Sequence, residues 1–396
     1  MNSRVVKRHL ADALVLVKLI FKGRISFRSP DLSEVVVFES TNCDYLLPLC
    51  EPYTVSVVEF PPSEVIINFS ILRSFFKSVI SGAPALASYY KACFDKISPR
   101  IVITFIDNSN RFYDLARLDK ENRRYLAIQN AARYDIVEMT QDEGKEICLP
   151  EFACFGEFEV DLYTSKNAVI DKFYIIGSLR EALYRRFRIQ HGYVNIVEQE
   201  KIYDICVVAE ASIGWDKKYP GHEDAVGKIA KYAKRLAEEE SLKLVIAGKR
   251  DITPNVTRVK NHSSNSEVEW YKKYIGDDFQ ITPRTREAFS TYELVTKSKL
   301  SIALVSTALR ESLSRGGRVL FCNFSDNSLW NFSLKKEKHV TFINQDDYLE
   351  FKKQVLLVLE MEEEEYFQKT QHLSRYIINP QTDKDAVDTL KEIIKN

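Results

Sequence analysis

The sequence predicts an α/β protein with two Rossmann-like lobes that face each other across a cleft, a GT-B-like arrangement, followed by a helical C-terminal tail. The chain of 396 residues is long enough for two domains of ordinary size. Short β-branched or aromatic runs alternate with amphipathic helical stretches along most of it. This alternation pauses once, so we expect a first lobe over 1–186, a linker over 187–203, a second lobe over 204–370 and a tail over 371–396.

In the first lobe the apolar runs predict strands over 34–38, 54–59, 100–106, 125–129, 153–156 and 173–177. Helices are predicted between some of them, over 71–81, 85–97 and 179–187. The segment Ile101-Val-Ile-Thr-Phe-Ile is apolar almost throughout, as a strand buried on both faces of a parallel sheet must be. The first lobe is therefore predicted to be a parallel sheet covered by helices.

The second lobe repeats this pattern. Strands are predicted over 205–209, 242–247, 279–281, 300–305, 318–322 and 340–343, and helices over 223–240, 287–297 and 307–315. From Asp346 onward the chain is predicted to be helical, and the acidic run Glu362–Glu365 is typical of a solvated helix start.

Composition excludes several classes of protein. The 56 Lys and Arg residues balance 56 Asp and Glu residues, whereas a general nucleic-acid binder carries a basic excess. The seven cysteines are scattered without a CxxC pair, and the six histidines show no HxH or HExxH spacing, so neither a disulfide framework nor a metal site is expected. These cysteines favour a reducing compartment, and the predicted location is the cytoplasm.

The charge balance hides a basic N-terminus. Residues 1–30 contain seven Lys and Arg residues and one acidic residue, Asp12. The apolar stretch Ala11–Phe21 is broken by Asp12 and Lys18 and is too short to span a bilayer. We expect a helix packed on the first lobe. The alternative is that this segment lies on the anionic surface of the inner membrane.

In parallel sheets, ligands bind beyond the carboxyl ends of the strands, so we expect the site residues to lie there. After the strand predicted over 300–305, Ser306 or Thr307 can cap the following helix and leave its N–H groups free for a phosphate. Glu311, one turn further, can accept hydrogen bonds from a ribose diol. The alternative is an ordinary capped helix with Glu311 on its surface.

Two more strand ends of the second lobe carry suitable residues. Gly214, in the loop after the first strand, permits close approach of the backbone, and Lys249 and Arg250 follow the second strand. Together these ends predict an anion site. The absence of GxxxxGK[ST] and GxGxxG disfavours a kinase, an ATPase or a dehydrogenase.

The strand ends of the first lobe offer carboxylates and amides instead. Asp107 and Glu157 follow two of its strands, and either can serve as a general base or nucleophile. The alternative is that such residues cap or turn the chain. The other candidates in this part of the cleft are Asn108, Gln129, Asn130, Arg133 and Ser178.

Five short segments, taken in order, resemble the bacterial surface carbohydrate biosynthesis proteins, which are glycosyltransferases of GT-B-like build. The segments are Ile103-Thr-Phe-Ile-Asp-Asn, Leu126-Ala-Ile-Gln-Asn, Cys154-Phe-Gly-Glu, Tyr174-Ile-Ile-Gly-Ser-Leu-Arg and Ser306-Thr-Ala-Leu-Arg-Glu-Ser. Within this group the chain resembles transferases that use CMP-activated Kdo or nonulosonic acids. In the family a Gly follows the Gln-Asn pair, where this chain has Ala131. The usual Ser-Thr-Leu-(Gly/Tyr)-Glu pattern is here Ser-Thr-Ala-Leu-Arg-Glu, with one extra residue before the carboxylate.

The resemblance implies that the second lobe holds a nucleotide-sugar donor and the first lobe a glycan or lipid-linked glycan acceptor. It implies donor contacts from Ser306, Thr307, Arg310, Glu311 and the Lys249-Arg250 pair, and it implies that no metal or other cofactor is needed. An ulosonic acid carries a carboxylate, for which Arg133, Lys249 or Arg250 is the expected partner.

Two other functions fit the same architecture. A hydrolysing sugar-nucleotide 2-epimerase also uses two Rossmann-like lobes but acts on the donor alone. A non-catalytic partner in polysaccharide assembly is the third hypothesis, and it is favoured by the altered Gln-Asn-Ala and Ser-Thr-Ala-Leu-Arg-Glu segments.

Overall fold

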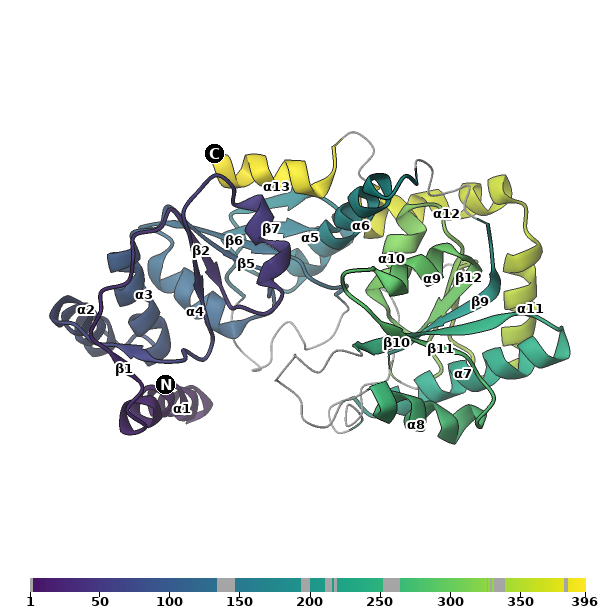
Figure 1. Cartoon of the computed structure of the whole chain (residues 1–396), viewed down its shortest axis with the longest axis horizontal. Coiled ribbons are helices and arrows are strands. Elements are labelled where there is room, and N and C mark those ends of the chain that lie inside the picture. The colour runs from purple at the N-terminus through teal and green to yellow at the C-terminus, as the bar shows by residue number, and fades with distance from the viewer. Residues whose placement is uncertain are drawn as a thin grey trace.

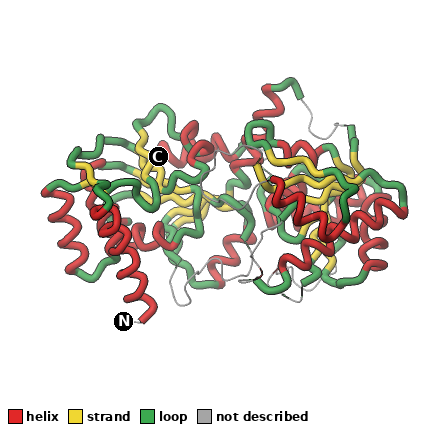
Figure 2. The backbone as a smooth tube through the Cα atoms, turned by 60° about the horizontal axis from the view of Figure 1, so that its bottom comes forward, coloured by secondary structure: helices red, strands yellow, loops and turns green. Residues whose placement is uncertain are grey.

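The computed structural model describes residues 3–133, 147–193, 200–210, 216, 219–251, 264–325, 327, 330, 339–380 and 384–396, and the side chains from residue 12 onward except those of 251, 264 and 265. Two lobes, each a parallel sheet covered by helices, lie side by side (Figures 1 and 2). The prediction of two Rossmann-like lobes with a helical C-terminus is confirmed.

The sheet of the first lobe has the order β3-β2-β5-β6-β7-β8, and each neighbouring pair is parallel. Its strands are β2 (Val35–Phe38), β3 (Val55–Val58), β5 (Ile101–Thr104), β6 (Arg124–Ile128), β7 (Glu151–Cys154) and β8 (Lys172–Ile175). Both β2 and β5 are buried along their whole length, as their continuous apolar sequences require. A separate parallel pair joins β1 (Ile25–Ser26) to β4 (Val65–Ile66).

Among the described residues of this lobe, the α-helices are α1 (Ser3–Phe21), α2 (Phe69–Ile80), α3 (Ala85–Ile97), α4 (Asn110–Asp119), α5 (Glu157–Ser165) and α6 (Leu179–Gln190). The sequence predicted α2, α3 and α6 to within a few residues but missed α4 and α5. These two helices directly follow β5 and β7, and the sequence was interpreted there as loops that carry site residues. Their polar first turns, capped at Ser109 and Gly156, hid the helical pattern.

The sheet of the second lobe has the order β11-β10-β9-β12-β13-β14, which is the Rossmann order with its reversal between β9 and β12. Its strands are β9 (Tyr203–Val208), β10 (Leu244–Asp251), β11 (Ile281–Arg284), β12 (Ser298–Ala303), β13 (Val319–Cys322) and β14 (Phe342–Ile343). The helices α7 (His222–Glu239), α8 (Ser264–Ile275), α9 (Ser290–Thr296), α10 (Thr307–Ser314) and α11 (Tyr348–Glu360) belong to the same lobe.

The last two helices return the chain to the first lobe. Helix α12 (Glu363–Ile377) crosses the boundary expected between residues 370 and 371, and α13 (Ala386–Lys395) packs on α6 (Figure 1). Asn379 N donates a 2.8 Å hydrogen bond to Phe155 O. The expected linker over 187–203 begins with the last residues of α6. The tail therefore ties the two lobes together rather than extending from the second one.

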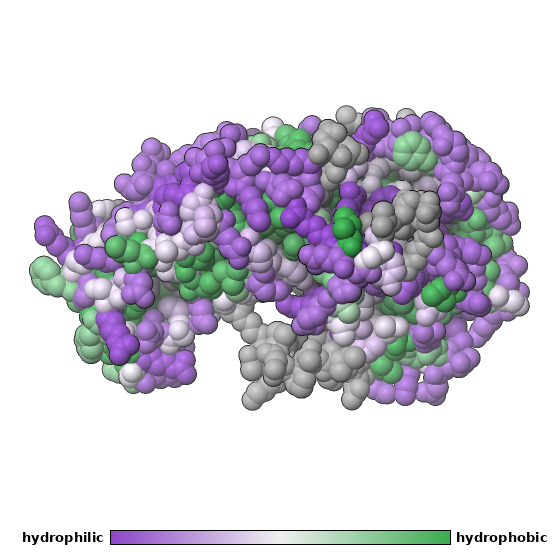
Figure 3. All heavy atoms as spheres, turned by 45° about the horizontal axis from the view of Figure 1, so that its top comes forward, coloured by the Kyte–Doolittle hydropathy of each residue, from purple (hydrophilic) through white to green (hydrophobic). Residues whose placement is uncertain are grey.

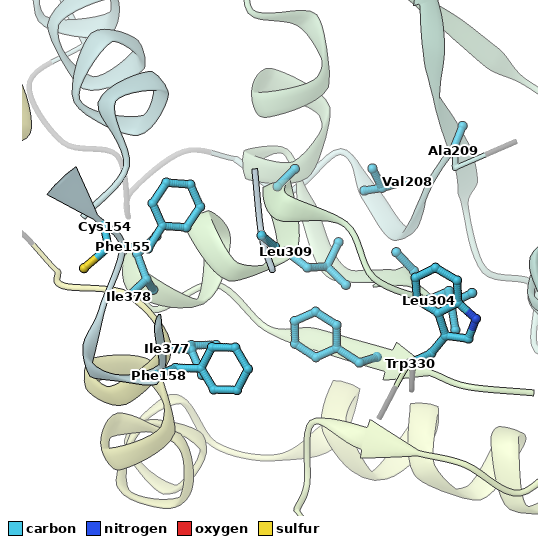
Figure 4. Packing of buried hydrophobic residues seen from close by; sticks show 14 of the residues in the cluster. Cys154, Phe155, Phe158, Val208, Ala209, Leu304, Leu309, Trp330, Ile377 and Ile378 are labelled. Atoms are coloured by element: carbon cyan, nitrogen blue, oxygen red, sulfur yellow. The ribbon is translucent and has the colours of Figure 1, made fainter. Parts of the chain in front are cut away.

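A continuous apolar core runs through the contact between the lobes. Cys154 and Phe158 of the first lobe belong to the same buried cluster as Leu309 of α10 and Ile377 of α12 (Figure 4). Gly156 lies at this contact, and a Cβ placed there would be only 2.5 Å from Tyr376 O. A glycine is thus needed where α12 meets the start of α5.

The N-terminal helix α1 packs on α3 and β4, as predicted for the first lobe, with Leu16 buried. Within the described residues, no helix is both long and apolar enough to cross a bilayer.

Candidate active site between the lobes

A cavity of about 500 Å³ lies between the lobes, where the carboxyl ends of the two parallel sheets meet. The first lobe contributes residues from the loops after β5 and β6 and from the start of α6. The second lobe contributes the ends of β9, β10 and β11 and the start of α10. Among the lining residues are Tyr45, Asn108, Asn130, Arg133, Arg180, Glu210, His222, Lys249, Arg284, Arg286, Ser306, Thr307, Glu311 and Trp330.

The cavity is electropositive. The cations among its described lining residues are Arg133, Arg180, Lys249, Arg284 and Arg286. The pKa of Lys249 is lowered by burial and by the neighbouring guanidinium groups of Arg250 and Arg284. An anion bound here would relieve that repulsion. The chemistry of these side chains therefore suits phosphate or carboxylate groups.

The N-terminus of α10 opens into the same cavity, with Ser306 as the N-cap residue. Thr307 Oγ1 accepts a 2.9 Å hydrogen bond from Ala132 N, so this helix start is fixed to the first lobe. The positive end of the helix dipole adds to the field of the cations.

Glu311 is the carboxylate that connects the cavity to both lobes. It is buried, and its Oε1 accepts a hydrogen bond of 2.5 Å from Ser178 Oγ of the first lobe. Burial raises the pKa of Glu311 to about 7, an effect that Glu181 reinforces and that Ser178, Tyr292 and Arg180 oppose. Oε2 is buried and makes no hydrogen bond of good geometry with the described residues. A carboxylate with a pKa near neutrality and an available oxygen is suited to accept a proton.

Glu210 is a second buried carboxylate of the cavity. Its oxygens accept hydrogen bonds from Leu304 N (2.7 Å) and Val305 N (3.0 Å), so it orders the end of β12. Burial raises its pKa to about 7, although these two bonds and Lys249 act in the opposite direction. His222 stands nearby with its pKa lowered to about 4 by burial and by Lys249, so it is neutral at pH 7.

Asp107 does not line the cavity. It is fully buried, its carboxylate pairs with Arg133, and it also accepts a 3.2 Å hydrogen bond from the Tyr163 hydroxyl. Asn130 N donates a further hydrogen bond of 3.2 Å to Asp107 Oδ1. The carboxylate thus orders the loop after β6, and it holds Arg133 and Asn130 at the edge of the cavity.

Arg310 and Gln129 are also buried rather than exposed to the cavity. Arg310 Nη1 donates a 2.8 Å hydrogen bond to Glu159 Oε1, and its Nη2 donates one of 2.6 Å to Arg133 O. Gln129 Nε2 donates to the same Glu159 oxygen at 3.0 Å. This cluster joins α10 of the second lobe to α5 and β6 of the first.

The remaining candidates are placed as follows. Glu157 is the exposed first residue of α5 and does not line the cavity. Arg250 N donates to Glu267 Oε2 at 3.1 Å, and Arg250 is not a lining residue. Ser178 caps α6 and reaches the cavity only through Glu311. Gly214 lies outside the described residues.

The sequence reasoning missed several lining residues. Arg284 and Arg286 escaped notice because the strand predicted over 279–281 is displaced, and β11 ends at Arg284. The strand-end rule would have found both with the correct boundary. Arg180 and Glu210 belong to strand-end segments that the sequence indicated, but neither was named as a site residue. The sequence around His222 and Trp330 shows no pattern that marks a site. His222 reaches the cavity as the first residue of α7, and Trp330 reaches it from a turn far along the chain.

Comparison with known proteins adds information on family and fold. A family described as "putative O-antigen biosynthesis protein" has a model that matches residues 245–392. No curated protein matches the chain. Among solved structures, the UDP-GlcNAc 2-epimerase of Methanocaldococcus jannaschii, in complex with UDP-GlcNAc and UDP, is 11% identical with a TM-score of 0.51, over 91% of this chain and 98% of that chain.

The wall teichoic acid polymerase TagF gives a similar result. Its H444N variant has a TM-score of 0.54 at 10% identity, and the same variant soaked with CDPG has a TM-score of 0.51 at 12% identity. Each comparison covers 98% of this chain and 97% of that chain. These likenesses show that the whole chain has the two-lobed GT-B-like fold found in both proteins.

Proposed function

We propose that the protein is a metal-independent glycosyltransferase that moves a sugar from a nucleotide-activated donor to a growing surface polysaccharide. The carrying observation is the cavity between the lobes, which combines Lys249, Arg284 and Arg286 with the N-terminus of α10 and with Glu311. This combination provides an anion site on one side and a proton acceptor on the other. The match of residues 245–392 to a family described as a putative O-antigen biosynthesis protein supports a role in making a surface polysaccharide.

In this proposal the second lobe binds the donor. The nucleotide phosphate lies at the start of α10 and near Lys249, where the helix dipole and the cation stabilise the negative charge that develops as the nucleotide leaves. A CMP-activated ulosonic acid is our favoured donor, because it carries a carboxylate as well as a phosphate. Arg284 and Arg286 supply two guanidinium groups for the second anion.

Glu311 is the proposed general base, in place of Asp107 and Glu157. The acceptor hydroxyl gives its proton to Glu311 Oε2, its oxygen forms a bond to the anomeric carbon, and the bond from that carbon to the phosphate oxygen breaks. The nucleotide leaves with the bonding electron pair. Asp107 is then a positioning residue that holds Arg133 and Asn130, and the buried Arg310 positions α10.

The acceptor is proposed to be a glycan or lipid-linked glycan that approaches from the first lobe, near Asn108, Asn130 and Arg180. A cytoplasmic location forms part of the proposal, since no disulfide joins the seven cysteines, all of which lie in the described part of the chain.

The first test is nucleotide binding by the purified full chain. A nucleotide that binds only the folded state raises the melting temperature, so CMP is expected to stabilise the protein more than UDP does. Lys249→Gln should weaken CMP binding roughly 10- to 100-fold, the range for a charge-assisted hydrogen bond. Lys353→Gln, at an exposed lysine of α11, is the matched control and should leave binding unchanged. If no nucleotide stabilises the folded protein, the proposal is contradicted.

A hydrolysing sugar-nucleotide 2-epimerase is the second candidate, supported by the fold shared with the Methanocaldococcus jannaschii enzyme. Product analysis separates the two functions. An epimerase releases a free sugar of inverted C2 configuration without an acceptor, whereas a transferase produces a glycosylated acceptor.

A further inference from the structure

The outer end of the first lobe carries two helices with the same exposed pattern. In α1, Leu14, Val17 and Phe21 are exposed, and in α2 the corresponding exposed residues are Phe69, Leu72 and Phe76. The spacing is i, i+3 and i+7 in both helices, which places the three side chains of each helix on one stripe. The exposed fractions of Phe21 and Phe69 are 87% and 83%, values that a packed aromatic residue does not reach.

Cations occupy equivalent places beside the two stripes. Counted from the first residue of each stripe, a cation follows at i+4 and another at i+8. These are Lys18 of α1 and Lys22 directly after it, and Arg73 and Lys77 of α2. All four are exposed. Their side chains can lie along the apolar stripe while their charges remain at its edge.

The connection between the helices extends this surface. Phe27 is 77% exposed, and Arg24 and Arg28 beside it are exposed as well. Both helices pack on α3, and they lie at the end of the first lobe away from the second lobe (Figure 1). Figure 3 shows hydrophobic residues exposed at this end of the molecule. We call these residues of α1, α2 and the segment after α1 the α1–α2 face.

The cations of the α1–α2 face lack ionic partners, unlike several cations of the second lobe. None of Lys18, Lys22, Arg24, Arg28, Arg73 and Lys77 forms an ion pair with a described residue. On the second lobe, by contrast, Lys228 pairs with Asp224 and Asp346, and Lys352 pairs with Glu239 and Glu240. Helix α2 contains no Asp or Glu, and Asp12 of α1 is buried. The α1–α2 face is therefore both apolar and uncompensated in charge.

We propose that the α1–α2 face docks on an anionic phospholipid bilayer. The apolar stripes enter the boundary between headgroups and acyl chains, while the six cations contact lipid phosphates. A second copy of the chain fits this surface poorly, because a two-fold contact would bring the two sets of cations together. Docking would hold the first lobe, which is proposed to take the acceptor, at a membrane where a lipid-linked glycan would be presented.

The α1–α2 face shares no residue with the cavity lining, so vesicle binding and nucleotide binding are independent measurements. The proposal goes beyond the proposed glycosyl transfer, and either can fail without the other. Nucleotide-dependent stabilisation of each variant reports that the cavity is intact.

The test is co-sedimentation of the full-length protein with vesicles. One set contains phosphatidylcholine alone, and the other contains equal parts of phosphatidylcholine and phosphatidylglycerol. We expect binding to the anionic vesicles that falls as salt increases, and much weaker binding to the neutral ones. Each Lys or Arg near an anionic surface contributes roughly fivefold to the binding constant, so neutralising four of them should weaken binding by roughly two orders of magnitude or more.

Two variants separate the apolar and charged contributions. Phe69→Ser with Phe76→Ser removes part of the α2 stripe, and both side chains are exposed, so the fold should persist. The charge variant replaces four cations by Gln at Lys18, Lys22, Arg73 and Lys77. Both variants should lose vesicle binding. Matched controls on other surfaces should retain it, and these are Leu349→Ser with Phe367→Ser and a Gln replacement of Lys231, Lys353, Lys391 and Lys395.

Three results would overturn the proposal. The first is no sedimentation of the folded protein with anionic vesicles at low salt. The second is equal binding to neutral and anionic vesicles. The third is a concentration-dependent dimer that the α2 variant disrupts, without any vesicle binding, since the face would then serve contact between copies of the chain.

Discussion

Ser178 Oγ of the first lobe donates a hydrogen bond of 2.5 Å to Glu311 Oε1 of the second. Ser178 caps α6 and Glu311 lies one turn into α10, so this bond joins two helix starts across the cleft. It occupies one carboxylate oxygen and leaves the other available at the cavity. Glu311 thus takes part in the contact between the lobes and is also the proposed proton acceptor.

Replacing Glu311 by Gln keeps the size of the side chain and removes the proton acceptor. We predict that Glu311→Gln lowers kcat by roughly 10²- to 10⁴-fold, the usual contribution of a general base, and changes the KM for the donor little. Steady-state kinetics measure both values. If Glu311→Gln instead raises the KM for the donor and leaves kcat unchanged, the role of Glu311 is to bind the ribose hydroxyls of the donor.

The raised pKa of Glu311 also predicts how stability depends on pH. Since the folded state raises this pKa from 4.5 to about 7, it binds the proton more tightly than the unfolded chain does. This contribution to stability is complete below pH 4.5 and is lost as pH rises through about 7. The loss is roughly 3 kcal/mol at pH 8, by the rule of 1.36 kcal/mol for each pKa unit.

Urea denaturation at pH 5 and pH 8 measures this difference. The Glu311→Gln variant should lose less stability between the two pH values than the parent protein does. Glu210, with its pKa also raised to about 7, adds a decline of the same sign that persists in this variant. An unchanged pH dependence in Glu311→Gln contradicts a raised pKa for Glu311.

The buried ion pair between Arg310 and Glu159 should be essential to the contact between the lobes. Both side chains are fully buried, so Arg310→Met leaves an uncompensated carboxylate and should cost roughly 3–5 kcal/mol of unfolding free energy. The double variant with Glu159→Gln should cost less than the sum of the single changes.

Lys352 provides the surface control, because it pairs with Glu239 and Glu240 at partly exposed positions. Lys352→Met should cost much less unfolding free energy than Arg310→Met does. Equal losses for Arg310→Met and Lys352→Met would show that the buried pair has no special role.

Gly156 should tolerate no side chain. A Cβ at this position would meet the backbone of Tyr376 and Ile377, so Gly156→Ala is predicted to displace α12 and to destabilise the protein by roughly 1–3 kcal/mol. The exposed neighbour Glu157 is the control, and Glu157→Ala should change stability by about 1 kcal/mol or less. Thermal unfolding compares the two variants, and equal melting temperatures would contradict the close approach.

Much of the fold could be predicted from the sequence because buried parallel strands have nearly continuous apolar sequences. The helix predicted over 85–97 coincides with α3, and the strands around β5 and β13 are found within two residues. Errors arise where the first turn of a helix is polar, as in α4, and where a strand is only half-buried, as in β11. In α4, charged residues stand between the apolar ones, and β11 has a proline among only four residues.

The candidate site was predictable as a region and less so residue by residue. Strand-end reasoning found Lys249, Ser306, Thr307 and Glu311, which all line the cavity. It could not tell that Asp107 pairs with Arg133, because that contact depends on a loop between neighbouring strands. Nor could it distinguish Arg310, which is buried against the other lobe, from a residue that faces a ligand. Helical periodicity places a side chain on a face, and only packing determines what covers it.

The most direct test of the central claim is transfer of a labelled sugar by the purified protein. The assay supplies a CMP-activated ulosonic acid, with UDP-sugars for comparison, together with a glycan or lipid-linked glycan acceptor, and it measures labelled acceptor and released nucleotide. The account predicts nucleotide release matched by labelled acceptor, and loss of both in Glu311→Gln. Labelled acceptor formed equally well by Glu311→Gln, or free sugar of inverted C2 configuration formed without acceptor, would contradict it.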